Sequence, residues 1–269
     1  MEDKLFDVSS DLVIVTGASG QLGHSYQKAF LDRGATVIGL DIVRSSHIDE
    51  LEKKYTSQFS FLEGDITSKV SLSDCLKTIE ANYGSPTVLI NNAGLDSPPD
   101  GSSLDNGPFE SFPEASWDKV MDVNLKGTFL ACQVFGSKMA EEQRGSIINI
   151  SSIYGLVSPD QSIYDYRKKN GEVFYKPVAY SASKSGLMNL TRYLAVYWAK
   201  KNVRVNTLTI AGVFNNQDQE FLDSYEARIP ISRMADSTQY DGAVIFLASA
   251  ASSYMTGSNM IIDGGWTAI

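Results

Sequence analysis

Tyr180 and Lys184 are the residues of this chain whose types and spacing most directly suggest chemistry. On a helix, side chains four residues apart lie on the same face, so the lysine ammonium would sit close to the phenol. A free tyrosine, with a pKa of about 10, is a poor base at neutral pH, but a nearby cation stabilises its phenolate. The pair therefore predicts a proton-transfer group. Tyr164 and Lys168 have the same spacing, and a solvated helix face would also explain it, so the surrounding elements must decide.

Three glycines, Gly17, Gly20 and Gly23, follow a short apolar run at residues 12–16 and open a helical pattern at residues 21–33. In a strand–turn–helix setting, such glycines allow a tight turn, close approach of the backbone to a pyrophosphate, and close packing of helix on strand. The free N–H groups at the start of the helix attract phosphate. The pattern predicts a dinucleotide-binding turn, with a flexible strand-to-helix loop as the plain alternative.

Asp41 ends the second apolar run. A carboxylate there accepts hydrogen bonds from the adenosine ribose hydroxyls and repels a 2′-phosphate, so it predicts NAD rather than NADP. The alternative is an ordinary turn or cap aspartate, and Arg44, three residues on, could instead receive a phosphate. After the third run, Asp65 and Ile66 are placed to meet the adenine, although Asp65 could equally cap the turn near Thr67.

Small and polar residues also follow the later apolar runs. Asn92, Ala93 and Gly94 come after the fourth run, where they would let the backbone approach a cofactor or would simply form a turn. Asn124 is an amide within an otherwise apolar helical stretch and could hold a water or a main-chain group. Ser152 follows another serine at the end of the fifth run. Because neighbouring side chains of a strand point to opposite faces, only one of the two serines can face a ligand.

These candidates are spaced along an alternation of short β-branched runs and longer helical patterns, which indicates a parallel sheet covered by helices on both faces. No repeat or low-complexity linker interrupts it. We therefore predict one α/β domain over residues 1–269, with a Rossmann-type, doubly wound, seven-stranded parallel sheet in three α/β/α layers. The predicted strands are 12–16, 36–41, 59–64, 87–91, 145–151, 203–209 and 259–262. The predicted helices are 21–33, 48–55, 70–83, 116–140, 179–200 and 237–248.

Three segments do not follow the alternation. Residues 95–115 are rich in Pro, Gly and Ser, residues 157–177 form a polar insertion with several tyrosines, and residues 212–235 look mobile. Each follows the carboxyl end of a strand, where ligands bind in open α/β sheets. We predict that these segments are substrate loops, although long loops are also where neutral insertions collect.

The composition limits the class of partner. A formal net charge of -9 gives no electrostatic footprint for nucleic acid or an anionic membrane, so we expect a small-molecule substrate. The first apolar run is too short for a signal peptide or a membrane span, which favours a cytoplasmic location. Cys75 and Cys132 lie in amphipathic helical patterns and predict two buried thiols. His24 and His47 stand without a cluster of further ligands, so we expect no metal site.

In their order along the chain, these motifs resemble the short-chain dehydrogenase/reductase family, in its single-domain branch, over nearly all of residues 10–267. The resemblance implies that Tyr180 is the catalytic acid/base and that Ser152 hydrogen-bonds the substrate oxygen. It also implies that Lys184 binds the nicotinamide ribose and lowers the tyrosine pKa, and that Asn124 anchors a water in a proton relay. The cofactor contacts that it implies are Gly17, Ser19, Gly20, Gln21, Leu22, Gly23, Asp41, Asp65, Ile66, Asn92, Ala93, Gly94, Tyr180, Lys184 and Val213.

Three features depart from the usual pattern of that family. Gln21 occupies the place of the usual middle glycine. Ala211 and Gly212 follow the sixth run, where the family usually has a Pro-Gly pair. Ser152 and Tyr180 lie 28 residues apart, a much longer gap than usual. A segment has therefore been added between the two catalytic groups.

We therefore expect an NAD-dependent oxidoreductase that transfers a hydride between the nicotinamide and a secondary alcohol or ketone. Arg167, Lys168, Lys169 and Lys176 could receive a sugar acid or a phosphorylated or nucleotide-linked sugar, or could be a solvated charge run. In this respect the chain looks like family members from bacterial surface-sugar pathways. The alternatives are an NADPH-dependent ketone or 3-oxoacyl reductase and, from another class, a non-catalytic dinucleotide-binding scaffold or sensor. The resemblance also implies a homodimer or homotetramer.

Overall fold

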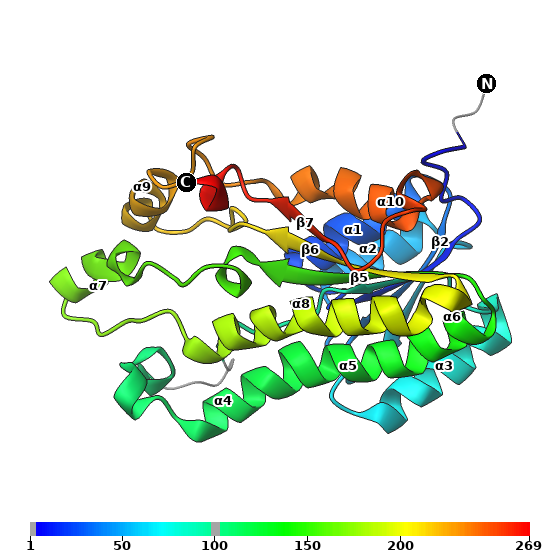
Figure 1. Cartoon of the computed structure of the whole chain (residues 1–269), viewed down its shortest axis with the longest axis horizontal. Coiled ribbons are helices and arrows are strands. Elements are labelled where there is room, and N and C mark those ends of the chain that lie inside the picture. Colours follow the sequence, from blue (N-terminus) through cyan, green and yellow to red (C-terminus); the bar gives the residue numbers. More distant parts are fainter. Residues whose placement is uncertain (1–3, 98–102) are drawn as a thin grey trace.

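The computed structural model describes residues 4–97 and 103–269 (Figure 1). Residues 98–102, including Pro98, Pro99 and Gly101 of the predicted 95–115 loop, lie outside the described residues. Seven strands of the described chain form one sheet. They are β1 (Leu12–Thr16), β2 (Thr36–Asp41), β3 (Phe59–Glu63), β4 (Val88–Asn91), β5 (Gly145–Ser152), β6 (Val203–Ile210) and β7 (Asn259–Ile262).

The strand order is β3-β2-β1-β4-β5-β6-β7, and neighbouring strands are parallel. This confirms the predicted doubly wound sheet. The order reverses between β1 and β4, so the loops that leave these two strands diverge and open a crevice at the carboxyl edge. Further along the same edge, the register pairs Ser152 of β5 with Ile210 of β6.

The strands form where the sequence has runs of β-branched and aliphatic residues. In β1 all five residues, Leu-Val-Ile-Val-Thr, are buried, and in β5 seven of the eight residues are buried. Such continuous burial is what a parallel sheet with both faces covered requires. Along β1, Val13 and Val15 belong to one hydrophobic core and Leu12 and Ile14 to the other.

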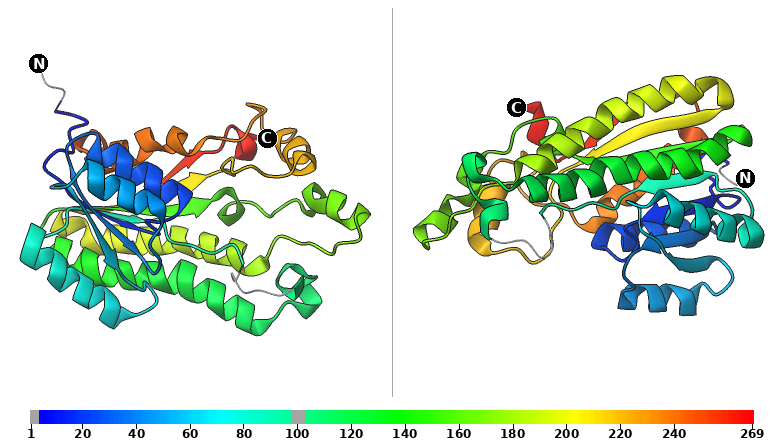
Figure 2. Two further views of the ribbon diagram at one scale, coloured as in Figure 1. Left: turned by 180° about the vertical axis from the view of Figure 1, so that it is seen from behind. Right: turned by 90° about the horizontal axis from the view of Figure 1, so that it is seen from below.

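Helices cover both faces of this sheet (Figures 1 and 2). They are α1 (Gln21–Leu31), α2 (Ser46–Lys54), α3 (Lys69–Tyr83), α4 (Glu114–Met121), α5 (Thr128–Ala131), α6 (Ser137–Glu141), α7 (Asp165–Lys169), α8 (Val178–Trp198), α9 (Gln219–Glu226) and α10 (Asp241–Ala248). Helices α1, α2 and α10 pack around the core that contains Tyr26 and Phe30. Helices α3, α5, α6 and α8 pack around the opposite core, which contains Phe135 and Trp198. The result is the predicted three-layer arrangement.

Residues 114–141 form a helical rod that is less regular than the single helix predicted for residues 116–140. The α-helices α4, α5 and α6 are separated by two π-helical turns, Asp122–Gly127 and Cys132–Gly136. Asn124 lies in the first of them. Such π turns are found often at functional sites, because they turn side chains and main-chain groups out of the regular helical repeat.

All three segments that interrupt the alternation contain short helices. In the described part of the 95–115 segment these are two 3-10 turns, Ser103–Asn106 and Phe109–Ser111. The 157–177 segment contains a 3-10 turn, Gln161–Tyr164, and α7, while the 212–235 segment contains α9. The 212–235 segment therefore contains regular helical structure that was not predicted from its composition. Figure 1 shows that α7 and α9 lie beyond the carboxyl ends of β5, β6 and β7, at the same end of the molecule as the start of α4.

Both cysteines, Cys75 and Cys132, are free and buried, which confirms the predicted pair of buried thiols. Within residues 4–97 and 103–269, no helix combines the length and the apolar character needed to cross a lipid bilayer. The same described residues contain no group of three or more His, Cys, Asp or Glu side chains arranged to hold a metal ion.

Candidate active site

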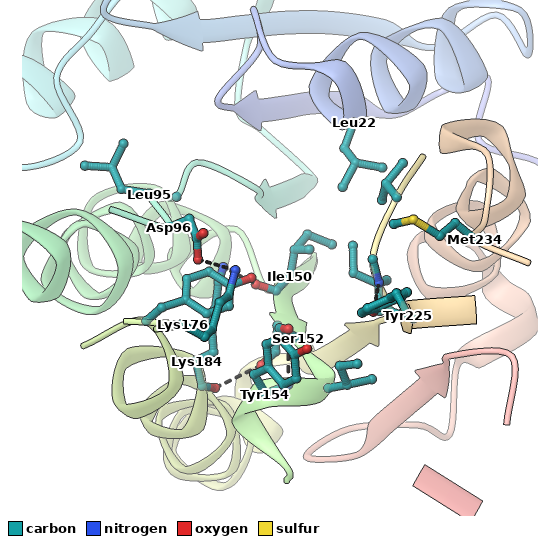
Figure 3. A pocket seen from close by; sticks show the side chains of 18 of the residues that line it. Leu22, Leu95, Asp96, Ile150, Ser152, Tyr154, Lys176, Lys184, Tyr225 and Met234 are labelled. Carbon is teal, nitrogen blue, oxygen red and sulfur yellow. Dashed lines mark hydrogen bonds and ion pairs between the residues drawn. The ribbon is translucent and has the colours of Figure 1, made fainter. Parts of the chain in front are cut away.

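Two cavities meet at the carboxyl edge of the sheet. The first, called the cleft here, has a volume of about 580 Å³ and follows the loops after β1, β2, β3 and β4. The second, called the tyrosine pocket, has a volume of about 350 Å³ and is lined by Tyr154, Tyr164, Tyr180 and Tyr225 among others (Figure 3). The residues that line both cavities are Leu22, Asn92, Gly94, Leu95 and Val213.

The glycine turn between β1 and α1 forms one end of the cleft. Gly17 has a φ of +66°, and a Cβ atom there would lie 2.7 Å from the Cα of Ala93. A Cβ at Gly23 would lie 2.1 Å from the main-chain oxygen of Gly17, so helix and turn pack too closely for any side chain. Gly20 precedes α1, and no side chain within the described chain caps the start of this helix. The start of α1 therefore has no side-chain cap among the described residues, and an uncapped helix start of this kind is suited to binding phosphate.

Asp41 lies on the wall of the cleft at the end of β2. Its carboxylate accepts a hydrogen bond of 3.0 Å from the main-chain N–H of Ser19. It accepts a second one, of 3.2 Å, from the main-chain N–H of the residue two positions after Asp41 itself. These bonds fix the direction of the carboxylate. Arg44 is already paired, since its guanidinium binds Asp49 at 2.8 Å and also Glu52. The positive charge of Arg44, which could have attracted a 2′-phosphate, is therefore balanced by these two carboxylates.

Asp65 and Ile66 line the cleft after β3, where the sequence placed them. The Asp65 carboxylate accepts hydrogen bonds from the main-chain N–H of Thr67 at 2.8 Å and from its hydroxyl at 2.7 Å. These are the contacts of a residue that caps a turn, which is the alternative that the sequence left open for Asp65. Ile66 is almost fully buried and packs against Gly127, in the π-helical turn of the rod.

The segment after β4 joins the cleft to the pocket. The Asn92 side chain donates a hydrogen bond of 3.1 Å to the main-chain oxygen of Thr16, and the Thr16 hydroxyl accepts one from the N–H of Ala93. These bonds hold the segment against the glycine turn. Gly94 then passes the start of α8 so closely that a Cβ atom there would lie 3.3 Å from Nζ of Lys184.

Ser152, Tyr180 and Lys184 come together in the tyrosine pocket. Ser152 is the last residue of β5, one residue beyond the predicted end of that strand, and the other two lie in the first two turns of α8. A hydrogen bond from Ser152 favours the ionised form of the phenol. The preceding residue, Ser151, donates instead to the main-chain oxygen of Lys184 at 2.9 Å. Of the two serines, Ser152 is the one that interacts with Tyr180.

Burial controls the charge state of this pair. Burial, and secondarily the Asp96 carboxylate, raise the pKa of Tyr180 above its ordinary value, against the smaller effect of Ser152. Burial also lowers the pKa of Lys184 to about 8. The ammonium lies 5.8 Å from the centre of the Tyr180 ring and donates a hydrogen bond of 3.0 Å to the main-chain oxygen of Ile150. The tyrosine pKa thus moves opposite to the predicted direction, because desolvation of the phenol dominates.

Asn124 is fully buried behind Lys184 and makes three hydrogen bonds. Its side chain accepts from the main-chain N–H of Leu95 at 2.7 Å and donates to the main-chain oxygen of Leu95 at 2.8 Å. It also donates to the hydroxyl of Ser183 at 3.0 Å. Of the two options left open by the sequence, the side chain therefore holds a main-chain group. Its position in the π-helical turn is what carries it across to the segment after β4.

The 157–177 insertion sends one basic side chain into the tyrosine pocket. Lys176 lines the pocket and binds the Asp96 carboxylate at 2.6 Å. Arg167 packs on an aromatic ring of its own segment, and Lys168 pairs with Asp165 at 2.9 Å in solvent. The four basic residues of the insertion therefore do not form one binding patch. Figure 3 shows Lys176 and Asp96 on the side of the pocket next to Lys184.

Comparisons with known proteins agree with this geometry. The sequence model of a family described as Enoyl-(Acyl carrier protein) reductase matches residues 17–267. An NAD-dependent glycerol dehydrogenase from Listeria innocua is 30% identical over 98% of this chain and 97% of its own. The chain belongs to the short-chain dehydrogenase/reductase family. It is accordingly an NAD(P)-dependent oxidoreductase that acts on CH–OH groups, which confirms the predicted class of enzyme.

Further members of the short-chain dehydrogenase/reductase family match over similar lengths. A D-threitol dehydrogenase from Mycolicibacterium smegmatis is 28% identical, with 97% of this chain and 95% of that protein covered. A crystal structure of a short-chain dehydrogenase from Leptospira borgpetersenii with bound NAD+ is 33% identical, with a TM-score of 0.86, and covers 99% of this chain and 96% of that one.

The departures from the family pattern have structural explanations in this dehydrogenase. Gln21, in place of the usual glycine, donates a hydrogen bond of 2.8 Å from its side chain to the main-chain oxygen of Phe214. It thereby ties the glycine turn to the 212–235 segment. Gly212, which follows Ala211 where a proline is usual, donates its N–H to the hydroxyl of Tyr225 at 2.8 Å. That bond fixes the turn after β6 beside Val213, which lines both cavities.

Several residues of the dehydrogenase pocket were not singled out by the sequence. Asp96, Tyr154 and Tyr225 line it, together with Tyr164, which the sequence offered only as a competing Tyr–Lys pair. Asp96 lies two residues beyond Gly94, the last residue of the predicted cofactor segment, so its place after the fourth strand was a usable signal. Tyr154 had a signal of the same kind, since it lies just beyond the end of β5. Tyr225 carried none, because it reaches the pocket from α9 in the 212–235 segment.

Proposed function

We propose that this enzyme is an NAD-dependent dehydrogenase of polyhydroxylated secondary alcohols, with Tyr180 as its acid/base. The observation that carries the proposal is the convergence of Ser152, Tyr180 and Lys184 where the cleft meets the pocket. The cleft fits a dinucleotide because the glycine turn excludes side chains at Gly17 and Gly23 and leaves the start of α1 uncapped by the described residues.

Each residue of the site has a defined task in alcohol oxidation. NAD, when bound, supplies the hydride acceptor. Ser152 donates a hydrogen bond to the substrate oxygen, and Tyr180 accepts the hydroxyl proton. Lys184 binds the nicotinamide ribose, and Asn124 supports the proton relay by fixing the segment beside it. Because burial raises the pKa of Tyr180, alcohol oxidation is expected to become faster as the pH rises.

Asp41 supports NAD as the preferred cofactor. Its oriented carboxylate can accept hydrogen bonds from ribose hydroxyls and would repel a 2′-phosphate. Arg44 is held by Asp49 and Glu52 and would have to leave both in order to bind that phosphate. We therefore place NADP second.

A polyol-type substrate is supported by the relatives and by the pocket. Two relatives are named for oxidation of glycerol and D-threitol, which are small polyhydroxylated alcohols. The tyrosine pocket is small and combines phenol groups with the charged side chains of Asp96, Lys176 and Lys184. Such a lining suits several hydroxyl groups better than the long alkyl chain of a 3-oxoacyl substrate.

The proposal is tested with Tyr180→Phe. This variant should lose at least about a thousandfold in kcat for alcohol oxidation, since it has no group to accept the proton. Its affinity for NADH, measured by fluorescence titration, should stay within about threefold of the wild type. Tyr254→Phe, at a fully exposed tyrosine outside both cavities, is the matched control and should keep full activity. A Tyr180→Phe enzyme with near-normal kcat would remove Tyr180 as the acid/base.

We also propose a homodimer or homotetramer that uses the exposed faces of α5 and α8. Phe129, Tyr193, Val196 and Tyr197 are large apolar or aromatic side chains exposed there, and the two tyrosine rings stack at 6.0 Å. Contiguous exposed apolar surface of this kind favours subunit contact. Light scattering on wild type and on Tyr197→Arg tests the idea: the variant should have the smaller mass. A cytoplasmic location, where both free thiols stay reduced, completes the proposal.

A further inference from the structure

Asp96 and Lys176 form an ion pair on the wall of the tyrosine pocket. Nζ of Lys176 lies 2.6 Å from Oδ1 of Asp96, and the two residues come from different segments that follow β4 and β5. The lysine side chain is 15% exposed, whereas the aspartate side chain is 47% exposed. The ammonium is therefore largely enclosed, and the carboxylate keeps free acceptor sites toward solvent and ligand.

The pair lies next to the proposed reacting centre. Nζ of Lys176 is 4.9 Å from the centre of the Tyr180 ring and 5.7 Å from that of Tyr154. Lys176 precedes α8, and Tyr180 lies in its first turn, so the lysine and the acid/base are positioned by the same short stretch. A substrate whose reacting oxygen contacts Tyr180 would occupy the same pocket, with this pair on its wall.

Both members of the pair are fixed through their main chains. Asp96 directly follows Leu95, whose N–H and C=O are bound by Asn124 at 2.7 and 2.8 Å. The N–H of Lys176 donates to the side-chain oxygen of Gln161 at 2.8 Å, and its C=O accepts from the same amide at 3.4 Å. Two separate amide side chains thus hold the two charges in place. This is the arrangement expected of a built subsite rather than a chance surface pair.

The charges of the pair determine what it can bind. An ammonium has three N–H donors and a carboxylate has several acceptor sites, so each keeps capacity for a hydroxyl group after pairing with the other. An anionic group should bind more weakly, because it would approach Lys176 within a few ångströms of the Asp96 carboxylate, which repels it. The hydroxyl of Tyr154, a residue 6% exposed in the same pocket, has no partner at hydrogen-bonding geometry among the described residues, although the Tyr164 phenol is close enough to affect its pKa.

We infer that Asp96 and Lys176 are the specificity-determining residues of the pocket, which bind hydroxyl groups next to the reacting carbon and select a neutral polyol against the corresponding sugar acid. This inference rests on the proposed function and narrows its substrate class. Among the sugar-like substrates that the sequence left open, it favours the neutral ones, because the basic residue of the insertion that reaches the pocket is already paired with a carboxylate.

The test compares three substrates of one length: a C4 polyol such as threitol, its aldonic acid threonate, and 2-butanol, which lacks the extra hydroxyls. The wild type should oxidise the polyol with a kcat/KM at least about tenfold above that for the acid. Asp96→Asn should lower the polyol kcat/KM about tenfold, mainly through KM, and should narrow the polyol-to-acid ratio. Lys176→Met should lower the polyol kcat/KM similarly, and in both variants the kcat/KM for the polyol should fall more than that for 2-butanol, so that the preference for the polyol over 2-butanol narrows.

The matched control is another ion pair of the same insertion, Asp165 with Lys168, which is exposed to solvent. Asp165→Asn and Lys168→Met should leave all three substrates unchanged. A wild type that prefers threonate, or an Asp96→Asn enzyme with an unchanged polyol-to-acid ratio, overturns the inference. Calorimetric binding of threitol and threonate to the NADH complex tests the pair independently of turnover, and tighter binding of the acid, or no measurable binding of the polyol, also overturns it. Failure of the proposed function would appear separately, as a Tyr180→Phe enzyme equal to the wild type.

Discussion

The ammonium of Lys184 donates a hydrogen bond of 3.0 Å to the main-chain oxygen of Ile150, beneath the phenol of Tyr180. Lys184 is 6% exposed, and burial lowers its pKa to about 8. A buried ammonium held by a single described carbonyl is poorly compensated for its lost hydration. The lysine is therefore retained at a cost in stability, as expected for a group that serves the active site.

Lys184→Met is accordingly predicted to stabilise the protein at pH 7 by about 2 kcal/mol while abolishing alcohol oxidation. Because the folded pKa lies below the unfolded value of 10.5, the native state binds fewer protons between about pH 8 and 10.5, and wild-type stability rises with pH across that window. The advantage of the variant should shrink over the same range. Urea unfolding at pH 7 and pH 9.5 measures both effects, and a less stable methionine variant at pH 7 would contradict the prediction.

Cofactor choice should depend on Asp41 and on the partners of Arg44 together. Asp41→Ala is predicted to lower the NAD-to-NADP ratio of kcat/KM about tenfold, by removing the repulsion of a 2′-phosphate. Adding Glu52→Gln should lower it about tenfold further, because Arg44 is then released from one of its two carboxylates. Glu50→Gln on the same helix is the control and should leave the ratio unchanged. If the double variant behaves like Asp41→Ala alone, Arg44 does not reach the cofactor.

The parts of this site that local patterns encode were predictable from the sequence. The strand β1 is a run of buried aliphatic residues, and Gly17 and Gly23 follow it at the spacing that a close strand–helix contact requires. Tyr180 and Lys184 share one helix face. In each case the signal lies within a few residues of the feature it predicts, and for this reason the strands, the glycine turn and the Tyr–Lys pair could be located from the sequence.

Features that depend on contacts between distant segments were not predictable. Asp96 and Lys176 meet because two loops from different strands converge, and no periodicity in either loop records this. The π-helical turn around Asn124 has the same apolar spacing as a regular helix, so the sequence favoured a regular helix. The raised pKa of Tyr180 results from burial, which depends on the whole pocket.

The fit of helix α1 against the glycine turn should be intolerant of a single methyl group. Gly23→Ala places a Cβ atom 2.1 Å from the main-chain oxygen of Gly17, which must move, and we predict a loss of about 3 kcal/mol of stability and weaker NAD binding. Gly242→Ala in α10 is the matched helical control. Nothing lies within 4 Å of its added Cβ, so it should stabilise the protein by about 0.5–1 kcal/mol. Chemical denaturation of both variants checks the contrast, which is lost if Gly23→Ala is as stable as the wild type.

A variant of Asn124 can show whether this residue positions the segment after β4 or serves only in proton transfer. Asn124→Ala leaves the N–H and C=O of Leu95 without their partner, so we predict a loss of about 2–3 kcal/mol of stability. Leu95 directly precedes Asp96, so a shift of Leu95 would also move the Asp96 carboxylate. The variant should therefore lose selectivity for a polyol over the sugar acid, and its KM for the polyol should rise. Asn82→Ala, which removes an exposed amide from α3, should change neither property.

The alternative for Asn124 gives a different kinetic pattern. A residue that served only a proton relay would lower kcat equally for threitol and 2-butanol and would leave the polyol-to-acid ratio intact. Steady-state kinetics of Asn124→Ala with threitol, threonate and 2-butanol therefore separate the two roles. An equal fall in kcat for both alcohols, with an unchanged ratio, would show that the bonds to Leu95 are not what sets the specificity of the pocket.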